Sequence, residues 1–177
     1  MALEVRPVRP GEMDEAGRVT AAAYRELAPE GHASWERYLQ RLADVRGRAR
    51  TTTVLVAVED GRVLASATLE LTGRVPGGYD RPPLDPDEAH LRMLGVHPSA
   101  RRRGIGRQMV EACMRLARRS GKSRLTLDTT GEMVAARAMY EAMGFLRGPD
   151  QVYPDGFRLL WYERSLHDVV PSPRDRP

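Results

Sequence analysis

Apolar and polar residues alternate along several segments that we predict to be strands. Residues 3–8 follow this period of two, which is typical of a half-buried strand. Residues 53–71 contain two β-rich runs on either side of Asp60-Gly61, a pair that favours a tight hairpin turn. Further strands are predicted at 90–96, 123–129, 151–153 and 157–166.

Other segments repeat their apolar residues with the period of a helix and predict four helices. They span 14–27, a segment from an N-cap at Ser34 to Val45, 106–119, and a segment from Thr129 to Gly144. The last of these begins with the residue pattern of a capping box, Thr129 to Glu132, and ends at a glycine suited to the position after a helix.

The order of these elements indicates one mixed α/β domain, which we place at 1–167, followed by a short tail at 168–177. Strand, helix and strand across 90–129 form a unit that makes two parallel neighbours in a sheet. Residues 72–88 hold four prolines and three glycines and predict a long loop, which suggests a role in function.

Composition narrows the possible functions. The 177 residues contain one cysteine, Cys113, which excludes an internal disulfide and fits a reducing, cytoplasmic location. The pattern of a signal peptide is missing from the start, and the apolar runs are too short to cross a membrane. The net charge is +4, but the arginines are spread over the whole chain, so we expect no nucleic-acid partner. The protein is expected to be a monomer or a homodimer.

The segment HPSARRRGIGR, residues 97–107, joins a predicted strand to the start of a predicted helix. The first turn of a helix has unpaired amides and a partial positive charge, and both favour an anion. Gly104 and Gly106 allow a close approach to phosphate, and arginine adds paired hydrogen bonds. The spacing fits neither a Walker loop nor a dinucleotide fingerprint. The alternative is a basic turn that is merely solvated.

Two stretches resemble the GNAT superfamily of acyl-CoA-dependent N-acyltransferases. LGVHPSARRRGIGRQMV resembles the family's motif A, V-x-P followed by [QR]-x-x-G-x-[GA], at Val96, Pro98, Arg101, Gly104 and Gly106. EMVAARAMYEAMGF resembles its motif B at Ala136, Tyr140, Gly144 and Phe145. The resemblance implies an α/β (α+β) fold with a centrally splayed sheet of six to seven strands and about four helices. Met133 stands where many relatives have an asparagine, so one amide contact to the cofactor is lost or replaced.

The same resemblance implies acetyl-CoA as cosubstrate and no metal. The pyrophosphate would rest on the loop and its arginines, at Arg101, Arg102, Arg103, Gly104, Ile105, Gly106 and Arg107. The pantetheine arm would follow the strand edge Leu94, Gly95 and Val96, with Ala136 and Tyr140 on the neighbouring helix. Gly95 would mark a bulge where the strands separate.

The expected reaction is direct attack of a primary amine on the thioester, with the Leu94 amide stabilising the oxyanion. Tyr140 would protonate the leaving thiolate. His90 takes the position of a glutamate in several relatives and would accept the amine's proton, with Glu88 as the substitute. Strand alternation places His90, Arg92, Leu94 and Val96 on one face. Each of these roles has a structural alternative, a packed tyrosine or a residue that merely ends a strand.

Acids in the long loop, at Asp80, Asp85, Asp87 and Glu88, suggest a cationic acceptor, such as a small amine, an antibiotic or a peptide. A solvated acidic loop is equally consistent with them. Cys113 falls on the inner side of a helix and is expected to be packing rather than a nucleophile. The rival function is an acyl-CoA-binding sensor domain without catalysis.

Overall fold

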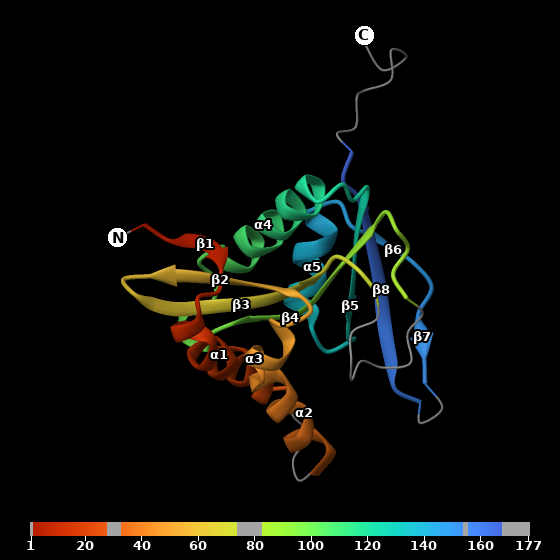
Figure 1. Cartoon of the computed structure of the whole chain (residues 1–177). Helices are drawn as coiled ribbons and strands as arrows, with labels where there is room; N and C mark the ends of the chain where they lie inside the picture. Colours follow the sequence, from red (N-terminus) through yellow and green to blue (C-terminus); the bar gives the residue numbers. More distant parts are fainter. Residues whose placement is uncertain (1, 28–32, 74–82, 154–155, 168–177) are drawn as a thin grey trace.

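The computed structural model describes residues 2–27, 33–73, 83–153 and 156–167. Its main feature is an eight-stranded sheet in the order β1-β2-β3-β4-β5-β8-β6, with β7 paired to β8 (Figure 1). The strands are β1 Glu4–Pro7, β2 Thr53–Glu59, β3 Arg62–Glu70, β4 Glu88–Val96, β5 Arg124–Thr129, β6 Leu146–Arg147, β7 Gln151–Val152 and β8 Arg158–Ser165.

The sheet opens between its two central strands. β4 and β5 are parallel, as the strand–helix–strand order predicts, but their pairing ends at Leu91 and Leu127. Beyond this point β4 continues beside β3 as far as Val96, whereas β5 continues beside β8 as far as Thr129. The expected splay at the centre of the sheet is therefore confirmed.

Five helices cover the two faces of the sheet (Figure 1). They are α1 Met13–Arg25, α2 Ala33–Ala43, α3 Val45–Arg48, α4 Ile105–Arg119 and α5 Val134–Ala142. α4 and α5 close the main core, where Met109 and Cys113 lie against strand residues such as Leu91 and Leu125. α1, α2 and α3 lie on the opposite face. Among the described residues, no helix is long and apolar enough to cross a membrane.

Two helix boundaries differ from the sequence prediction. The helix predicted to run from Ser34 to Val45 starts at Ala33 and ends at Ala43, because the Asp44 carboxylate accepts the amide hydrogen of Gly47 at 2.8 Å and starts a separate helix, α3. The predicted capping box does not form: Thr129 stays in β5, and α5 begins only at Val134. The two-residue strand β6 was not predicted.

A β-bulge in β4 changes which side chains share a face. Met93 and Leu94 together lie opposite one residue of β3, and Met93 has φ of +53°. Met93 therefore packs on α2, whereas Leu94 and Val96 pack on the opposite side, toward the main core. The expectation that His90, Arg92, Leu94 and Val96 share one face is wrong, since the bulge reverses the alternation after Arg92.

A bulge was predicted at Gly95, and it lies directly before this residue, at Met93 and Leu94; the glycine itself is required for a further reason. A Cβ atom there would lie 3.0 Å from the Cβ of Ala23 and 3.2 Å from the Cα of Thr20. Glycine at this position therefore allows α1 to pack directly on the strand.

We expect Gly17→Ala to lower the free energy of unfolding by about 1–3 kcal/mol, because the added methyl group overpacks the α1–α2 contact. Its Cβ would lie 2.1 Å from the carbonyl oxygen of Ala43. Alanine normally stabilises a helix relative to glycine by about 1 kcal/mol, so a loss identifies the clash. Urea unfolding measures the difference. Gly11→Ala is the control, because its methyl group would meet nothing within 4 Å; equal effects of the two changes would contradict the packing argument.

Candidate active site

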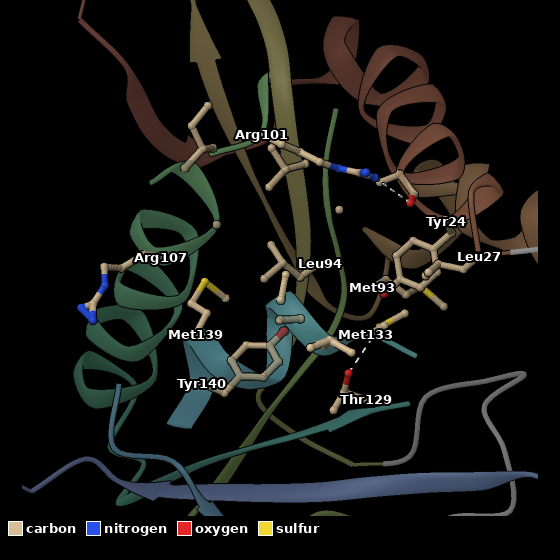
Figure 2. Close-up of a pocket in the computed structure, with 18 of the residues that line it drawn as sticks. Tyr24, Leu27, Met93, Leu94, Arg101, Arg107, Thr129, Met133, Met139 and Tyr140 are labelled. Carbon is tan, nitrogen blue, oxygen red and sulfur yellow. Dashed lines mark hydrogen bonds between the residues drawn. The ribbon is translucent and has the colours of Figure 1, made fainter. Parts of the chain in front are cut away.

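A cleft of about 590 Å³ lies where β4 and β5 separate. Its walls are the C-terminal part of α1, the second half of β4, the loop before α4, the end of β5 and the start of α5. Figure 2 shows side chains from these elements converging on one space, with Leu94 and Tyr140 at its centre. The splay therefore produces a cavity between segments that are far apart in the sequence.

The loop before α4 has the backbone shape expected of an anion site. A short 3-10 turn, Pro98–Ala100, follows β4 and buries Ala100. Arg102 and Gly104 then adopt left-handed conformations, with φ of +60° and +74°, and α4 starts at Ile105. Gly104, Ile105 and Gly106 line the cleft, so the start of α4 faces it. The helix leaves its first amides without intrahelical acceptors, and their partial positive charge favours an anion.

Three of the loop arginines already have acidic partners in the fold. Arg101 forms an ion pair with Glu26 of α1 and also donates to the carbonyl oxygen of Ala23 at 3.2 Å. In Figure 2 its side chain reaches toward α1. The other two pairs are Arg103 with Glu59 at 2.7 Å and Arg107 with Glu111 at 4.0 Å. All three pairs are exposed, so such contacts exchange readily for a phosphate. Arg101, Arg102 and Arg107 line the cleft.

Tyr140 lies on α5 at the bottom of the cleft. Its side chain is buried, and its ring packs against Phe145 and Tyr162. Figure 2 shows its hydroxyl pointing toward Leu94 of the β4 bulge. Burial raises the pKa of this phenol above its ordinary value, so it stays protonated at neutral pH. Tyr140 can therefore act as a hydrogen-bond donor or as an acid within the cleft.

Ala136 and Met133 also line the cleft from α5. Met133 occupies the N-cap position of that helix, and its sulfur accepts a hydrogen bond from the Thr129 hydroxyl at 3.3 Å (Figure 2). Met133 therefore places a thioether where many relatives have an asparagine, whose side-chain amide could donate a hydrogen bond to the cofactor. The wall is correspondingly more apolar than the family pattern predicts.

His90 and Glu88 lie beside the cleft rather than on its wall. His90 is buried, stacks on Trp161 with ring centres 5.9 Å apart, and approaches the hydroxyl of Thr126 with Nδ1 at 2.9 Å. The same hydroxyl donates to the Glu88 carboxylate at 2.6 Å, so it accepts from His90. His90 Nε2 then faces the carboxylate of Asp128 at 3.4 Å.

Asp128 is the member of this chain of contacts that lines the cleft. Asp128 was not among the residues predicted from the sequence. The sequence shows that Thr126 and Asp128 alternate along β5 and so share a face, but the register that sets this face beside His90 of β4 comes from the structure. A row of polar side chains thus runs from the beginning of the parallel strands to the cleft. We call it the β4–β5 polar row, and it consists of Glu88, Thr126, His90 and Asp128.

The acids of the long loop do not line the cleft. Asp85 forms an ion pair with Arg124, and Asp87 accepts a hydrogen bond from Ser123 at 2.6 Å. Both contacts lie at the beginning of β4 and β5, at the other end of these strands from the cleft. Asp80 lies outside the described residues. These acids therefore do not support the predicted cationic acceptor.

Cys113 is fully buried, and burial raises the pKa of its thiol to about 12. The expectation that it packs in the core is confirmed. Within the described ranges, no group of three or more histidine, cysteine or acidic side chains is arranged to hold a metal ion.

Curated relatives carry names of acetyltransferases. The chain is 32% identical over 152 residues to a mycothiol acetyltransferase of Mycolicibacterium gilvum, a match that covers 86% of this chain and 41% of the relative. It is 35% identical over 99 residues to human N-acetyltransferase 8, covering 56% of this chain and 41% of that protein. The chain thus spans less than half the length of these relatives.

Solved structures share the fold. A Salmonella typhimurium structure described as an acetyltransferase with its cofactor acetyl-CoA superposes with a TM-score of 0.70 at 19% identity, covering 95% of this chain and 96% of that one. The ribosomal-protein-S18-alanine N-acetyltransferase of Escherichia coli gives 0.67 at 16% identity, covering 97% and 98%. The model of the acetyltransferase (GNAT) family matches residues 20–145. Together with the splayed sheet and the loop before α4, this match shows that the chain belongs to the GNAT family of acetyltransferases.

Proposed function

We propose that the protein transfers an acetyl group from acetyl-CoA to a primary amine by direct attack within a ternary complex. The observation that supports this most is the convergence, around one cleft, of the start of α4, the β4 bulge, the Tyr140 hydroxyl and the Asp128 carboxylate. These supply an anion site, amides next to the thioester, an acid and a base. An acyl-CoA sensor would need only the first.

The start of α4 and the loop before it would hold the pyrophosphate. Gly104 and Gly106 leave the approach open, because a Cβ at Gly104 would meet nothing within 4 Å and one at Gly106 would meet only side chains, at 3.4 Å or more. Arg101, Arg102 and Arg107 would add charged contacts at the rim. The bulge residue Leu94 would present its amide to the thioester oxygen.

The amine nitrogen would attack the thioester carbon, and the carbon–sulfur bond would break as the carbonyl re-forms. Tyr140 would give its proton to the leaving thiolate and take back the second proton that the nitrogen loses as the amide forms. Burial keeps this phenol protonated before the transfer. Asp128 would accept the proton that the incoming ammonium loses. His90, with Glu88 behind Thr126, would hold the Asp128 carboxylate in place and share that proton across the 3.4 Å contact. In this arrangement His90 and Glu88 act through Asp128.

We expect Gly104→Val to abolish acetyl-CoA binding while the protein remains folded, because the side chain would fill the space above the first amides of α4. The left-handed backbone adds a strain of about 1–2 kcal/mol. Gly121→Val is the matched control: it also has a left-handed φ, +77°, and open space, but it follows the C-terminal end of α4. Calorimetry of acetyl-CoA binding is the measurement. Equal affinity in the two variants would contradict the assignment of the loop.

We expect Tyr140→Phe to reduce turnover by about 10²–10⁴-fold with little change in acetyl-CoA affinity, because it removes the acid and keeps the ring. Release of the CoA thiol measures turnover. Tyr153→Phe, in which the tyrosine belongs to the segment after β7, is the control. Activity of Tyr140→Phe within threefold of the parent would transfer the acid role to water.

We expect Asp128→Asn to reduce kcat/KM by about 10²–10⁴-fold at neutral pH. The loss should shrink as pH rises, because an amine that is already deprotonated needs no base. Asp87→Asn, at the opposite end of the strands, is the control and should leave the pH–rate profile unchanged. A deficit in Asp128→Asn that stays constant across the pH range would indicate that Asp128 only supports the structure.

A further inference from the structure

Two arginines lie close to the buried acid Glu70 on the face of β3 and β4 that α2 and α3 cover, the face that also carries the β4–β5 polar row. Thr68 and Glu70 of β3 stand beside Arg92 of β4, and Arg48 of α3 reaches into the same region. Glu70 is 5% exposed in its side chain and accepts from Arg92 Nη1 at 2.7 Å. Arg92 is thus bound on one side by a buried carboxylate of the neighbouring strand.

Arg48 is held by four hydrogen bonds within the fold and is not among the residues that line the cleft. It donates to the Thr68 hydroxyl at 3.2 Å and to the carbonyl oxygens of Leu42, Arg41 and Asp44. Burial and the nearby charge of Arg92 lower the pKa of Arg48 to about 10. Its role is to close α3 onto the sheet, and its positive charge adds to that of Arg92.

Arg92 lines the cleft, and only part of its guanidinium is hydrogen-bonded within the described residues. Its one hydrogen-bonded acceptor in the part of the chain that the structure describes is Glu70, through Nη1. Nε and Nη2 remain for another acceptor. An arginine side chain that is one-fifth exposed and has a planar pair of donors is suited to a carboxylate.

Arg92 and Asp128 both line the cleft just beyond the end of the β4–β5 pairing. His90 is level with Thr126 and Leu91 with Leu127, and Arg92 and Asp128 are the next residues of the two separating strands. Both share the face of the β4–β5 polar row, because side chains two residues apart on a strand point to the same side. Neighbouring strands are about 4.8 Å apart, and here they begin to separate. The two charges therefore lie within the reach of one small molecule.

The remaining wall next to Arg92 is mainly apolar. Tyr24, Leu27 and Met93 line it (Figure 2). Tyr24 also packs edge-on against Tyr38 of α2. Burial raises the pKa of the Tyr24 phenol, so its hydroxyl stays neutral. Such a wall suits an uncharged substituent on the acceptor.

We propose that the acceptor is an amino acid, with its amine at Asp128 and its carboxylate on Arg92. This rests on the proposed function and specifies its substrate class. The acceptor carboxylate would take the hydrogen bonds of Arg92 Nε and Nη2, and the fork of Arg92 would orient the amine toward the thioester. An amine without a carboxylate would leave the guanidinium without its ligand, which is the kind of loss that a built polar site rejects.

The experiment compares each of the twenty common amino acids with its decarboxylated amine and its amide, at fixed acetyl-CoA, by CoA release. At least one amino acid should exceed both its amine and its amide in kcat/KM by tenfold or more, since one charged hydrogen-bonded contact is worth about 10–100-fold. Preference for the decarboxylated amines throughout would overturn the inference and leave the acetyltransferase function standing. Turnover with no member of any set, together with no acetyl-CoA binding, would overturn both.

A double variant, Arg92→Gln with Glu70→Gln, tests the residue itself without leaving a buried charge unpaired. It should lower kcat/KM for the preferred amino acid by about 10–100-fold, mainly through KM, and leave the matching amine unaffected. Arg46→Gln with Asp14→Asn removes an exposed arginine–aspartate pair and is the control. An equal loss on amino acid and amine would show that Arg92 serves only the fold.

Discussion

The end of hydrogen bonding between β4 and β5 is the constraint on which the site depends. A parallel pair that continued past Leu91 and Leu127 would close the sheet and leave no cleft. The bulge at Met93 and Leu94 bends β4 away and reverses its side chains, while β8 keeps β5 extended on the other side. Both separated edges retain a neighbour that holds them, so the opening is a rigid feature of the sheet.

The two faces of the central strands carry different kinds of side chain and serve different parts of the proposed reaction. One face is apolar and packs on α4 and α5, where Tyr140 is embedded among Phe145 and Tyr162. The other face carries the β4–β5 polar row and Arg92, groups that would be costly to bury without partners. Each has such a partner in a neighbouring strand. The acid of the proposed reaction therefore comes from the apolar side, and the base and the acceptor contacts come from the polar side.

Most of the fold could be predicted from the sequence, because it depends on local patterns of residues. The hairpin at Asp60-Gly61 and the unit of strand, helix and strand around 97–107 follow from turn chemistry and periodicity. A bulge was predicted near Gly95, but its position was not, since nothing in EAHLRMLGV marks Met93 for a positive φ. That one residue decided which side chains reach the cleft. Asp128 was missed for a related reason, because its importance comes from the register between two strands. Likewise, the ion pairs of Arg101 and Arg103 join segments that only the tertiary structure brings together.

Because Cys113 is buried, we expect the folded protein not to react with thiol reagents. The one cysteine of the chain is buried in the core, and burial raises the pKa of its thiol to about 12. A disulfide reagent added to the native enzyme should therefore react with the released CoA thiol and not with the protein. A cysteine introduced at Val134, which is 64% exposed at the rim of the cleft, would be the one reactive thiol in the native protein. A fluorescent or spin label attached there would report on cleft occupancy without any need to remove a native cysteine.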